Sequence, residues 1–400
     1  MKSILSLPVP ILHRILSQLP IQDKKNVSLV CLYLWKIISF PSMWSPAQVK
    51  SQQMCSVEKL TKFFSIPRYS LLLTLDLSNL KYPIIDKTVI TQLLKYLQNN
   101  SSLVTVRLTN TNVSQVPAFP LSSGLAHVTT LELSNTRLET EQLNGILGKC
   151  CRGKYTKNVD FSYNNFTYVN TELLAASVLT LESVNLSYTD LSPIYSRRVM
   201  QSVRDSTVSV LNMSGNDLSD CKLDNIALNQ NLRVLKMSEV KFRPENLESI
   251  FSNMTLIHNL EELCLDGTAL GDVDPILLSD AVVRVVRVDL NFCWLYCDHV
   301  EFIFDAITAQ TRLKYLNLSG NHLENVNIDL MLNALHHLNV CRMEWANLTE
   351  EHFEALISDT GDLKENNTVI LNHFELIENF VDLHRKAKLN TNIQLNMVKG

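Results

Sequence analysis

The sequence predicts a curved α/β solenoid, with parallel strands on the concave face and helices on the convex face. Short apolar strand patterns recur along most of the 400 residues, and helix cap signals follow many of them. Before the first strand, residues 1–45 contain three short helical patterns. We therefore expect a small helical domain over residues 1–45 and a repeat array over residues 46–400.

The clearest strand pattern runs from Leu313 to Leu323 and reads LKYLNLSGNHL. Leu316 and Leu318 lie two residues apart, so both point to the same face of an extended strand. Asn321 stands where a small side chain is needed to bond the turn amides that the curving backbone leaves open. This is the L-x-x-L-x-L-x-x-N-x-L unit of a leucine-rich repeat. One such strand cannot cover its own apolar face, so the units must be stacked.

Aligning the central apolar residue of each strand gives a regular series. After a first interval of 31 residues, the intervals are 24 to 28 residues and alternate between long and short. Most of the longer units show helix cap signals after the strand. The alternation resembles the ribonuclease-inhibitor type of repeat, which implies a leucine-rich-repeat horseshoe of about thirteen or fourteen repeats. The central residues are Leu75, Val106, Leu131, Val159, Val184, Leu211, Leu235, Leu263, Val288, Leu316, Cys341, Val369 and Ile393.

Composition excludes several classes of protein. Apolar residues make up 46% of the chain, which is enough for a large core, and the net charge of −4 argues against a nucleic-acid-binding protein. No apolar run reaches the ~18 residues of a membrane span. The nine Cys show no pairing pattern of a disulfide framework, so we expect a reduced protein of the cytoplasm, the nucleus or both.

The first helical segment carries Ile11, Leu12, Ile15 and Leu16 on one stripe. Pro8 suits a helix start, where a missing amide hydrogen costs nothing. Two further segments follow, and the head closes at residues 41–44 with the sequence PSMW. Three helices in about forty residues bury too little surface to be stable alone, so they need a partner or a neighbouring domain.

Residues 7–44 resemble the F-box, through LPVPILHRILSQLP, VSLVC and PSMW. The resemblance implies docking to a Skp-type adaptor and, through it, to a cullin. Leu34 stands in place of the usual family Trp, and Lys24-Lys25 replaces a pair that is usually apolar. Alternatively, the head merely caps the first repeat, as solenoids require. The implied adaptor-binding residues are Leu7, Pro8, Ile11, Leu12, Ile15, Leu16, Val30, Cys31 and Leu34.

The sequence predicts neither catalysis nor a cofactor. It contains no glycine-rich phosphate loop, no H-E-x-x-H and no nucleophile elbow. Cys293, Cys297 and His299 form the most metal-like group. Cys293 falls in the same turn position as Asn321, however, and no second Cys/His pair lies close by. We therefore expect a structural role for these residues and no metal.

The predicted partner-binding residues lie on the later repeats. Strand residues that alternate away from the core are small and polar in the early repeats, whereas the later repeats carry aromatic residues and Arg, which anchor protein interfaces. Tyr163 and Tyr188 share a turn position with Phe292 and Trp345. The alternative is that these aromatic residues pack against one another and shield the turn. The predicted substrate-binding residues are Arg287, Phe292, Trp294, Tyr315, Arg342 and Trp345.

Together these features predict a non-catalytic, substrate-recognition subunit of an SCF-type cullin-RING ubiquitin ligase. The head would bind the adaptor and the repeats would bind a protein substrate, which is thereby brought close to the ubiquitin carrier. The alternative is a non-degradative scaffold or inhibitor of the ribonuclease-inhibitor type, with the N-terminal helices as a cap. Neither hypothesis involves nucleic acid or a membrane.

Overall fold

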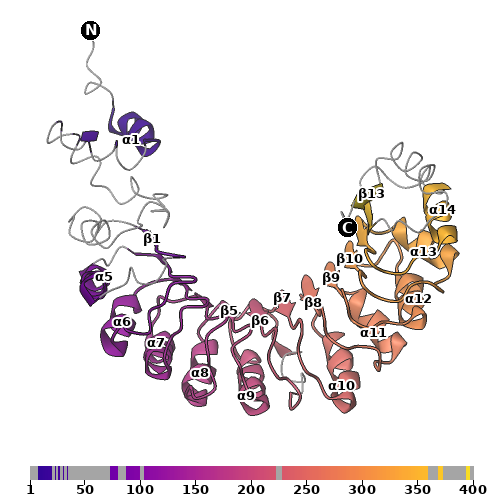
Figure 1. Cartoon of the computed structure of the whole chain (residues 1–400), viewed down its shortest axis with the longest axis horizontal. Helices are drawn as coiled ribbons and strands as arrows, with labels where there is room; N and C mark the ends of the chain where they lie inside the picture. Colours follow the sequence, from indigo (N-terminus) through magenta and orange to yellow (C-terminus); the bar gives the residue numbers. More distant parts are fainter. Residues whose placement is uncertain are drawn as a thin grey trace, which may run out of the picture. The chain divides into compact units, whose positions relative to one another are not determined.

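The computed structural model describes residues 8–19, 23, 26–27, 30, 34, 73–79, 87–99, 103–221, 228–358, 368–372 and 393–396. The chain divides into two compact units, Met1–Thr189 and Asp190–Gly400. Within each unit, parallel strands lie along the inner side of a curve and helices along the outer side (Figure 1). The predicted boundary between residues 45 and 46 lies outside the described residues.

The first unit begins with helix α1 (Val9–Ser17), and strands alternate with helices from residue 74 onward. None of the helices in the described parts of either unit combines the length and apolar character needed to cross a membrane. The elements after α1 are β1 (Thr74–Asp76), α5 (Lys87–Asn99), β2 (Thr105–Arg107), α6 (Ala118–Leu125), β3 (Thr130–Glu132), α7 (Thr140–Arg152), β4 (Asn158–Asp160), α8 (Thr171–Val178) and β5 (Ser183–Asn185).

The second unit continues the alternation. Its elements are α9 (Pro193–Val203), β6 (Val210–Asn212), β7 (Val234–Lys236), α10 (Pro244–Met254), β8 (Glu262–Cys264), α11 (Pro275–Val282), β9 (Arg287–Asp289), α12 (Cys297–Ala306), β10 (Tyr315–Asn317), α13 (Ile328–Leu335), β11 (Val340–Arg342), α14 (Glu350–Ser358), β12 (Thr368–Asn372) and β13 (Ile393–Asn396). Leucine-rich-repeat strands thus line one face, as predicted.

The strand register confirms the predicted series of central residues. In the first unit, Leu75, Val106, Leu131, Val159 and Val184 pair in turn across β1 to β5. In the second unit, the same pairing runs from Leu211 through to Ile393. The central residues from Leu75 to Val369 are at most 4% exposed. A slip of one residue would turn every one of these side chains out of the core, so their burial specifies the register.

Helices occur in the short units as well as the long ones, which the sequence pattern did not predict. The helices of the 25-residue units, α6, α8, α11 and α13, are 8 residues long. Those of the longer units, α7, α9, α10, α12 and α14, have 9 to 13 residues. Two turns of helix give too little apolar periodicity to be visible in a sequence, since the pattern repeats only every 3.6 residues.

Strands β1 to β11 each end in a turn. The fourth residue after the strand centre there adopts a left-handed conformation, with φ between 50° and 70°. In this conformation the backbone N–H points toward the next repeat and donates a hydrogen bond to it. Phe292 N, for example, donates to Ser319 O at 2.8 Å, and Gly320 N donates to Glu344 O at 2.7 Å. The series, called here the turn row, comprises Asn79, Asn110, Asn135, Tyr163, Tyr188, Gly215, Glu239, Gly267, Phe292, Gly320 and Trp345.

At most turn-row positions the residue that follows bonds the turn, as predicted for Asn321, whereas Val240 and Ala346 are apolar. Asn321 Oδ1 accepts from the N–H groups of Cys293 and Leu295 at 3.1 and 3.0 Å, and its Nδ2 donates to Leu290 O at 2.8 Å. Asn164 makes the equivalent bonds in the first unit. Thr111 and Thr268 donate a hydroxyl to the carbonyl oxygens of Leu77 and Met237. The buried turn amides and carbonyls are thereby satisfied between neighbouring repeats.

A second repeated device joins the helices to the preceding repeat. The third residue of a longer helix accepts a hydrogen bond from the backbone N–H at the helix start and donates to a loop carbonyl of the repeat before. Gln142 Oε1 accepts a hydrogen bond from Glu139 N at 2.8 Å, and Gln142 Nε2 donates to Val113 O at 2.9 Å. His352 Nδ1 accepts a hydrogen bond from Thr349 N at 3.3 Å, and His352 Nε2 donates to Val326 O at 2.9 Å. Such a bridge satisfies an orphan amide that every helix start leaves open.

Candidate protein-binding surface

Arg287, Tyr315 and Arg342 lie together on the strand face of β9 to β11. Tyr315 pairs with Arg287 on one side and Val340 on the other. The guanidinium carbon of Arg287 lies 3.6 Å from the centroid of the Tyr315 ring. This stacked cation–π contact holds both side chains in place while the edge of the guanidinium keeps its donors. The strand face therefore presents a preformed Arg–Tyr pair, where the sequence predicted partner-binding residues.

Arg342 differs from Arg287 because it already has an anionic partner. Its guanidinium is held by the Glu344 carboxylate, with Nε 3.0 Å from Oε2, and this hydrogen bond raises the pKa of Arg342. Arg287 is exposed, and among the described residues it makes no ion pair within 4.0 Å. The group on this face that is best placed to accept a partner's charge is thus Arg287 rather than Arg342.

Phe292 and Trp345 belong to the turn row, at its left-handed positions, with φ of 50° and 58°. Their side chains are 53% and 44% exposed. A Cβ added to Gly320 would clash with the Phe292 ring, so this ring occupies the space that a side chain at position 320 would need. Bulky residues adopt this conformation at a cost of roughly 1–2 kcal/mol relative to Gly. Exposed aromatic side chains are among the residue types that anchor protein interfaces.

Trp294 and Tyr296 extend the aromatic surface toward the start of α12. Trp294 has a φ of 59° and is 61% exposed, and Tyr296 is 56% exposed. A Cβ at Gly271 would lie 2.9 Å from Trp294 O and 3.2 Å from the Tyr296 ring, so the preceding repeat approaches both residues closely. Tyr296 was not among the predicted residues. Tyr296 lies two residues after Trp294 and four after Phe292, and this spacing could have placed it in the same aromatic group from the sequence alone.

In the first unit, the turn row packs against itself. Asn110 Nδ2 donates to Asn79 Oδ1 and Asn135 Nδ2 donates to Asn110 Oδ1, both at 2.9 Å. Tyr163 and Tyr188 then stack with ring centroids 4.8 Å apart and planes 7° apart. The alternative of mutual packing therefore holds for these two Tyr. This leaves the aromatic residues of the second unit as the better candidates for partner binding.

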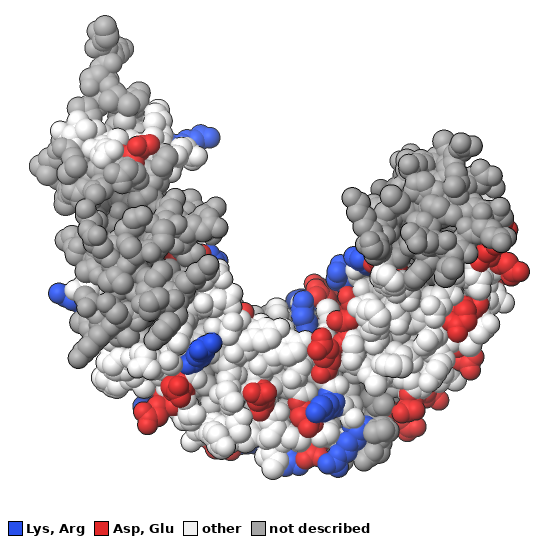
Figure 2. Space-filling view, in the orientation of Figure 1, with Lys and Arg blue, Asp and Glu red and all other residues white. Residues whose placement is uncertain are grey.

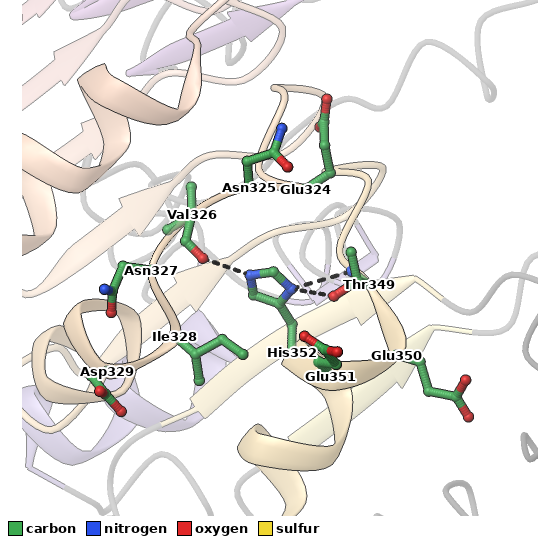
Figure 3. Close-up of a pocket in the computed structure, with 10 residues that line it drawn as sticks. All are labelled: Glu324, Asn325, Val326, Asn327, Ile328, Asp329, Thr349, Glu350, Glu351 and His352. Atoms are coloured by element: carbon green, nitrogen blue, oxygen red, sulfur yellow. Dashed lines mark hydrogen bonds between the residues drawn. The ribbon is translucent and has the colours of Figure 1, made fainter.

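A groove of about 890 Å³ lies where the loop before α13 faces the start of α14. Figure 3 shows His352 in it, hydrogen-bonded to Val326 and Thr349. Both ring nitrogens are thus used within the chain, and the rest of the lining is mostly polar, including Glu324 and Glu351, with Ile328 as an apolar member. His352 has a structural role here.

Cys293, Cys297 and His299 do not form a metal site. Cys293 is buried with its Sγ 3.1 Å from Leu265 O, and burial raises its pKa well above the usual range of a thiol. His299 Nε2 bonds Val273 O at 2.9 Å, and its Nδ1 faces Tyr296 N. Within the described part of the chain, no group of three His, Cys, Asp or Glu side chains is placed to hold a metal ion.

The structure revises which residues of the head can face a partner. Leu12, Leu16 and Leu34 are at most 6% exposed, so they pack within the chain. Ile11 and Ile15 are 48% and 42% exposed on α1. An apolar stripe does not show which of its residues face the chain's own core. The further exposed residues of the predicted face are Pro8 and Val30, whereas Leu7 and Cys31 lie outside the described residues.

No family model matches the chain, and no curated protein matches it. Among solved structures, an internalin from Listeria monocytogenes is 13% identical, with 86% of this chain and 94% of that chain covered and a TM-score of 0.51. A leucine-rich-repeat (LRR) protein from Leptospira interrogans is 15% identical, with coverages of 79% and 94% and a TM-score of 0.43.

The leucine-rich-repeat-containing protein LegL7 from Legionella pneumophila is 19% identical, with coverages of 82% and 93% and a TM-score of 0.39. At such identities the likeness concerns the fold alone. The strand register, the turn row and the Asn321 position agree with it. The chain has the leucine-rich-repeat solenoid fold.

Proposed function

We propose that the chain is the substrate-recognition subunit of an SCF-type cullin-RING ubiquitin ligase. Its head binds a Skp-type adaptor and its second unit binds a protein substrate. The proposal rests on the F-box-like pattern of residues 7–44. The observation that carries it is that α1 keeps Ile11 and Ile15 exposed, while Leu12 and Leu16 on the same helix are buried.

Exposed apolar side chains on a short helix favour docking to a partner. Ile11 and Ile15 lie four residues apart, so together they form a small apolar patch on the outer side of a helix of 9 residues. Exposed apolar side chains that lie together are the feature that a partner helix or groove would cover. Because Leu12 and Leu16 hold the helix to its own chain, the patch is presented on a fixed support.

The substrate end is the surface formed by Arg287, Tyr315, Phe292, Trp294 and Trp345, with Arg342 held by Glu344 beside it. Aromatic residues and Arg supply most binding energy in protein interfaces. The ligase subunit itself contributes no chemical group to ubiquitin transfer in this proposal. It raises the local concentration of a substrate Lys near the charged carrier.

The test is a double dissociation in the full-length chain. Ile11→Asp with Ile15→Asp places two charges on the outward patch without touching Leu12 or Leu16, and it should abolish adaptor capture while preserving partner capture. Trp345→Asn should abolish partner capture while preserving adaptor capture. The assignment fails if the wild-type chain captures no adaptor, or if the Asp pair leaves capture unchanged while circular dichroism shows a folded array.

The second candidate is a non-degradative scaffold in which the head only caps the array. The burial of Leu12, Leu16 and Leu34 favours it, since these residues pack within the chain as a cap would. The same experiment separates the two functions. A cap predicts no adaptor complex, together with loss of thermal stability when Leu12→Asp opens the head.

A further inference from the structure

The second unit has one edge at which all its strands end and its helices begin. This turn edge is defined by four segments that follow β8 to β11, namely residues 266–276, 291–301, 319–329 and 344–354. Because the strands are parallel and in register, these segments lie side by side. Phe292, Trp294, Tyr296 and Trp345 all belong to it and are 44% to 61% exposed.

The turn edge carries charge of one sign only. Its four segments contain no Lys and no Arg. The charged side chains that Figure 2 shows over α12 and α13 are acidic. Six exposed carboxylates on the edge make no ion pair with a described residue, namely Asp272, Asp274, Asp298, Asp329, Glu351 and Glu354.

Basic residues of the same repeats lie at the opposite ends of the strands. Arg284 precedes β9, and Arg312 and Lys314 precede β10. Arg312 reaches back to bond His258 O at 2.6 Å, and Lys314 bonds His337 O at 3.3 Å. The exposed acids Asp280 and Asp305 also lie near that opposite end, so its charge is mixed, whereas the turn edge carries acidic side chains only and holds the exposed aromatic rings.

Helix capping explains only part of this charge. Asp274 caps α11 through Ile276 N at 2.8 Å, and Asp298, Asp329 and Glu351 lie in first helical turns, where the helix dipole favours an anion. Capping satisfies backbone amides but does not neutralise the carboxylates. It also explains neither Asp272, which lies outside any helix, nor the exposed aromatic side chains among these acids.

We propose that the turn edge binds a Lys- and Arg-rich segment of the protein partner. The partner's cations would lie over the faces of Trp294, Tyr296 and Phe292, between the carboxylates. A cation over an aromatic ring is favourable, most of all on Trp, and nearby carboxylates add to the attraction. This inference rests on the proposed function, since it names the chemistry of the segment that the second unit takes.

The first experiment titrates the full-length chain with a synthetic peptide of alternating Lys, Arg and Gly, and with a Glu and Gly peptide of equal length. Binding is followed by calorimetry and by tryptophan fluorescence. We expect the basic peptide to bind and the acidic peptide not to bind. Raising the salt concentration should weaken binding, because exposed charges are screened beyond about 10 Å at 0.1 M. Equal binding of both peptides, or binding of neither, would overturn the inference.

Variants then locate the contact. Asn at position 294 suits the left-handed turn and removes the ring. Trp294→Asn should therefore weaken the affinity for the basic peptide by about fivefold. Asp298→Asn with Asp329→Asn should weaken the affinity for the basic peptide to a similar degree and make this affinity less dependent on salt. The matched control is Asp280→Asn, an exposed carboxylate near the end of α11 and off the edge. Retained affinity in the edge variants, with melting temperatures unchanged, would refute the assignment.

Adaptor capture is measured on the same samples. If the adaptor binds and Trp345→Asn abolishes capture of a protein partner, but the basic peptide fails to bind, the inference is wrong and the proposed function stands. If the adaptor fails to bind while the basic peptide binds at the turn edge, the ligase role is wrong and the edge remains a site for a basic segment.

Discussion

The guanidinium of Arg287 lies 3.6 Å from the centroid of the Tyr315 ring, on the neighbouring strand of the same repeat face. Arg287 and Tyr315 are separated by one whole repeat in the sequence, and only the parallel register brings them together. The contact orders a long cationic side chain before any partner arrives. Pre-ordering of this kind lowers the entropic cost of binding.

Tyr315→Leu should weaken partner binding more than Tyr315→Phe does. The Phe ring can still support Arg287, whereas Leu removes the cation–π contact and leaves the guanidinium free to move. We expect a loss of about fivefold for Leu, corresponding to about 1 kcal/mol, and a smaller loss for Phe. Affinity measured by calorimetry checks this. Equal losses would show that the ring does not position Arg287.

Trp345→Asn should reduce partner binding without lowering stability. Asn occupies the same turn-row position in the first unit, where it adopts φ values of 52° to 61°. Replacing Trp by Asn relieves part of the roughly 1–2 kcal/mol of backbone strain. A melting temperature at or above that of the wild type, with reduced capture, is the expected pair of results. A clear drop in melting temperature would assign Trp345 a packing role instead.

His352→Gln should preserve stability better than His352→Leu. Gln142 makes the same two kinds of bond at the start of α7, so an amide can serve at this position. Leu leaves the Thr349 N–H and the Val326 carbonyl without their bonds to His352. We expect Leu to cost about 1–3 kcal/mol in the free energy of unfolding and Gln to cost less. Chemical denaturation measures both, and equal costs would contradict the bridge.

Thiol labelling should follow the burial of the cysteines. Burial raises the pKa of Cys341 to about 12, and its residue is 1% exposed, so it should resist alkylation at neutral pH in the native chain. Cys297 is partly exposed and should react before Cys341. Mass spectrometry of timed samples gives the order. Early modification of Cys341 would show that β11 does not hold a closed core.

The strand register could be predicted from the sequence because a one-residue slip would expose every central side chain. The bonding role of Asn321 followed from residue chemistry. The conformations of Phe292 and Trp345 could not be predicted, since aromatic residues disfavour the left-handed region that the repeat imposes on them. The inward packing of Leu12 was equally hidden, because an apolar stripe does not reveal whether it faces its own chain or a partner.

The central claim is that the head docks a Skp-type adaptor through the outward face of α1. Its most direct test is light scattering of purified full-length chain mixed with the adaptor. We predict a stable complex of one chain and one adaptor, which Ile11→Asp with Ile15→Asp dissolves and Trp345→Asn leaves intact. Two separate species with the wild-type chain, at concentrations well above those in a cell, would contradict the claim.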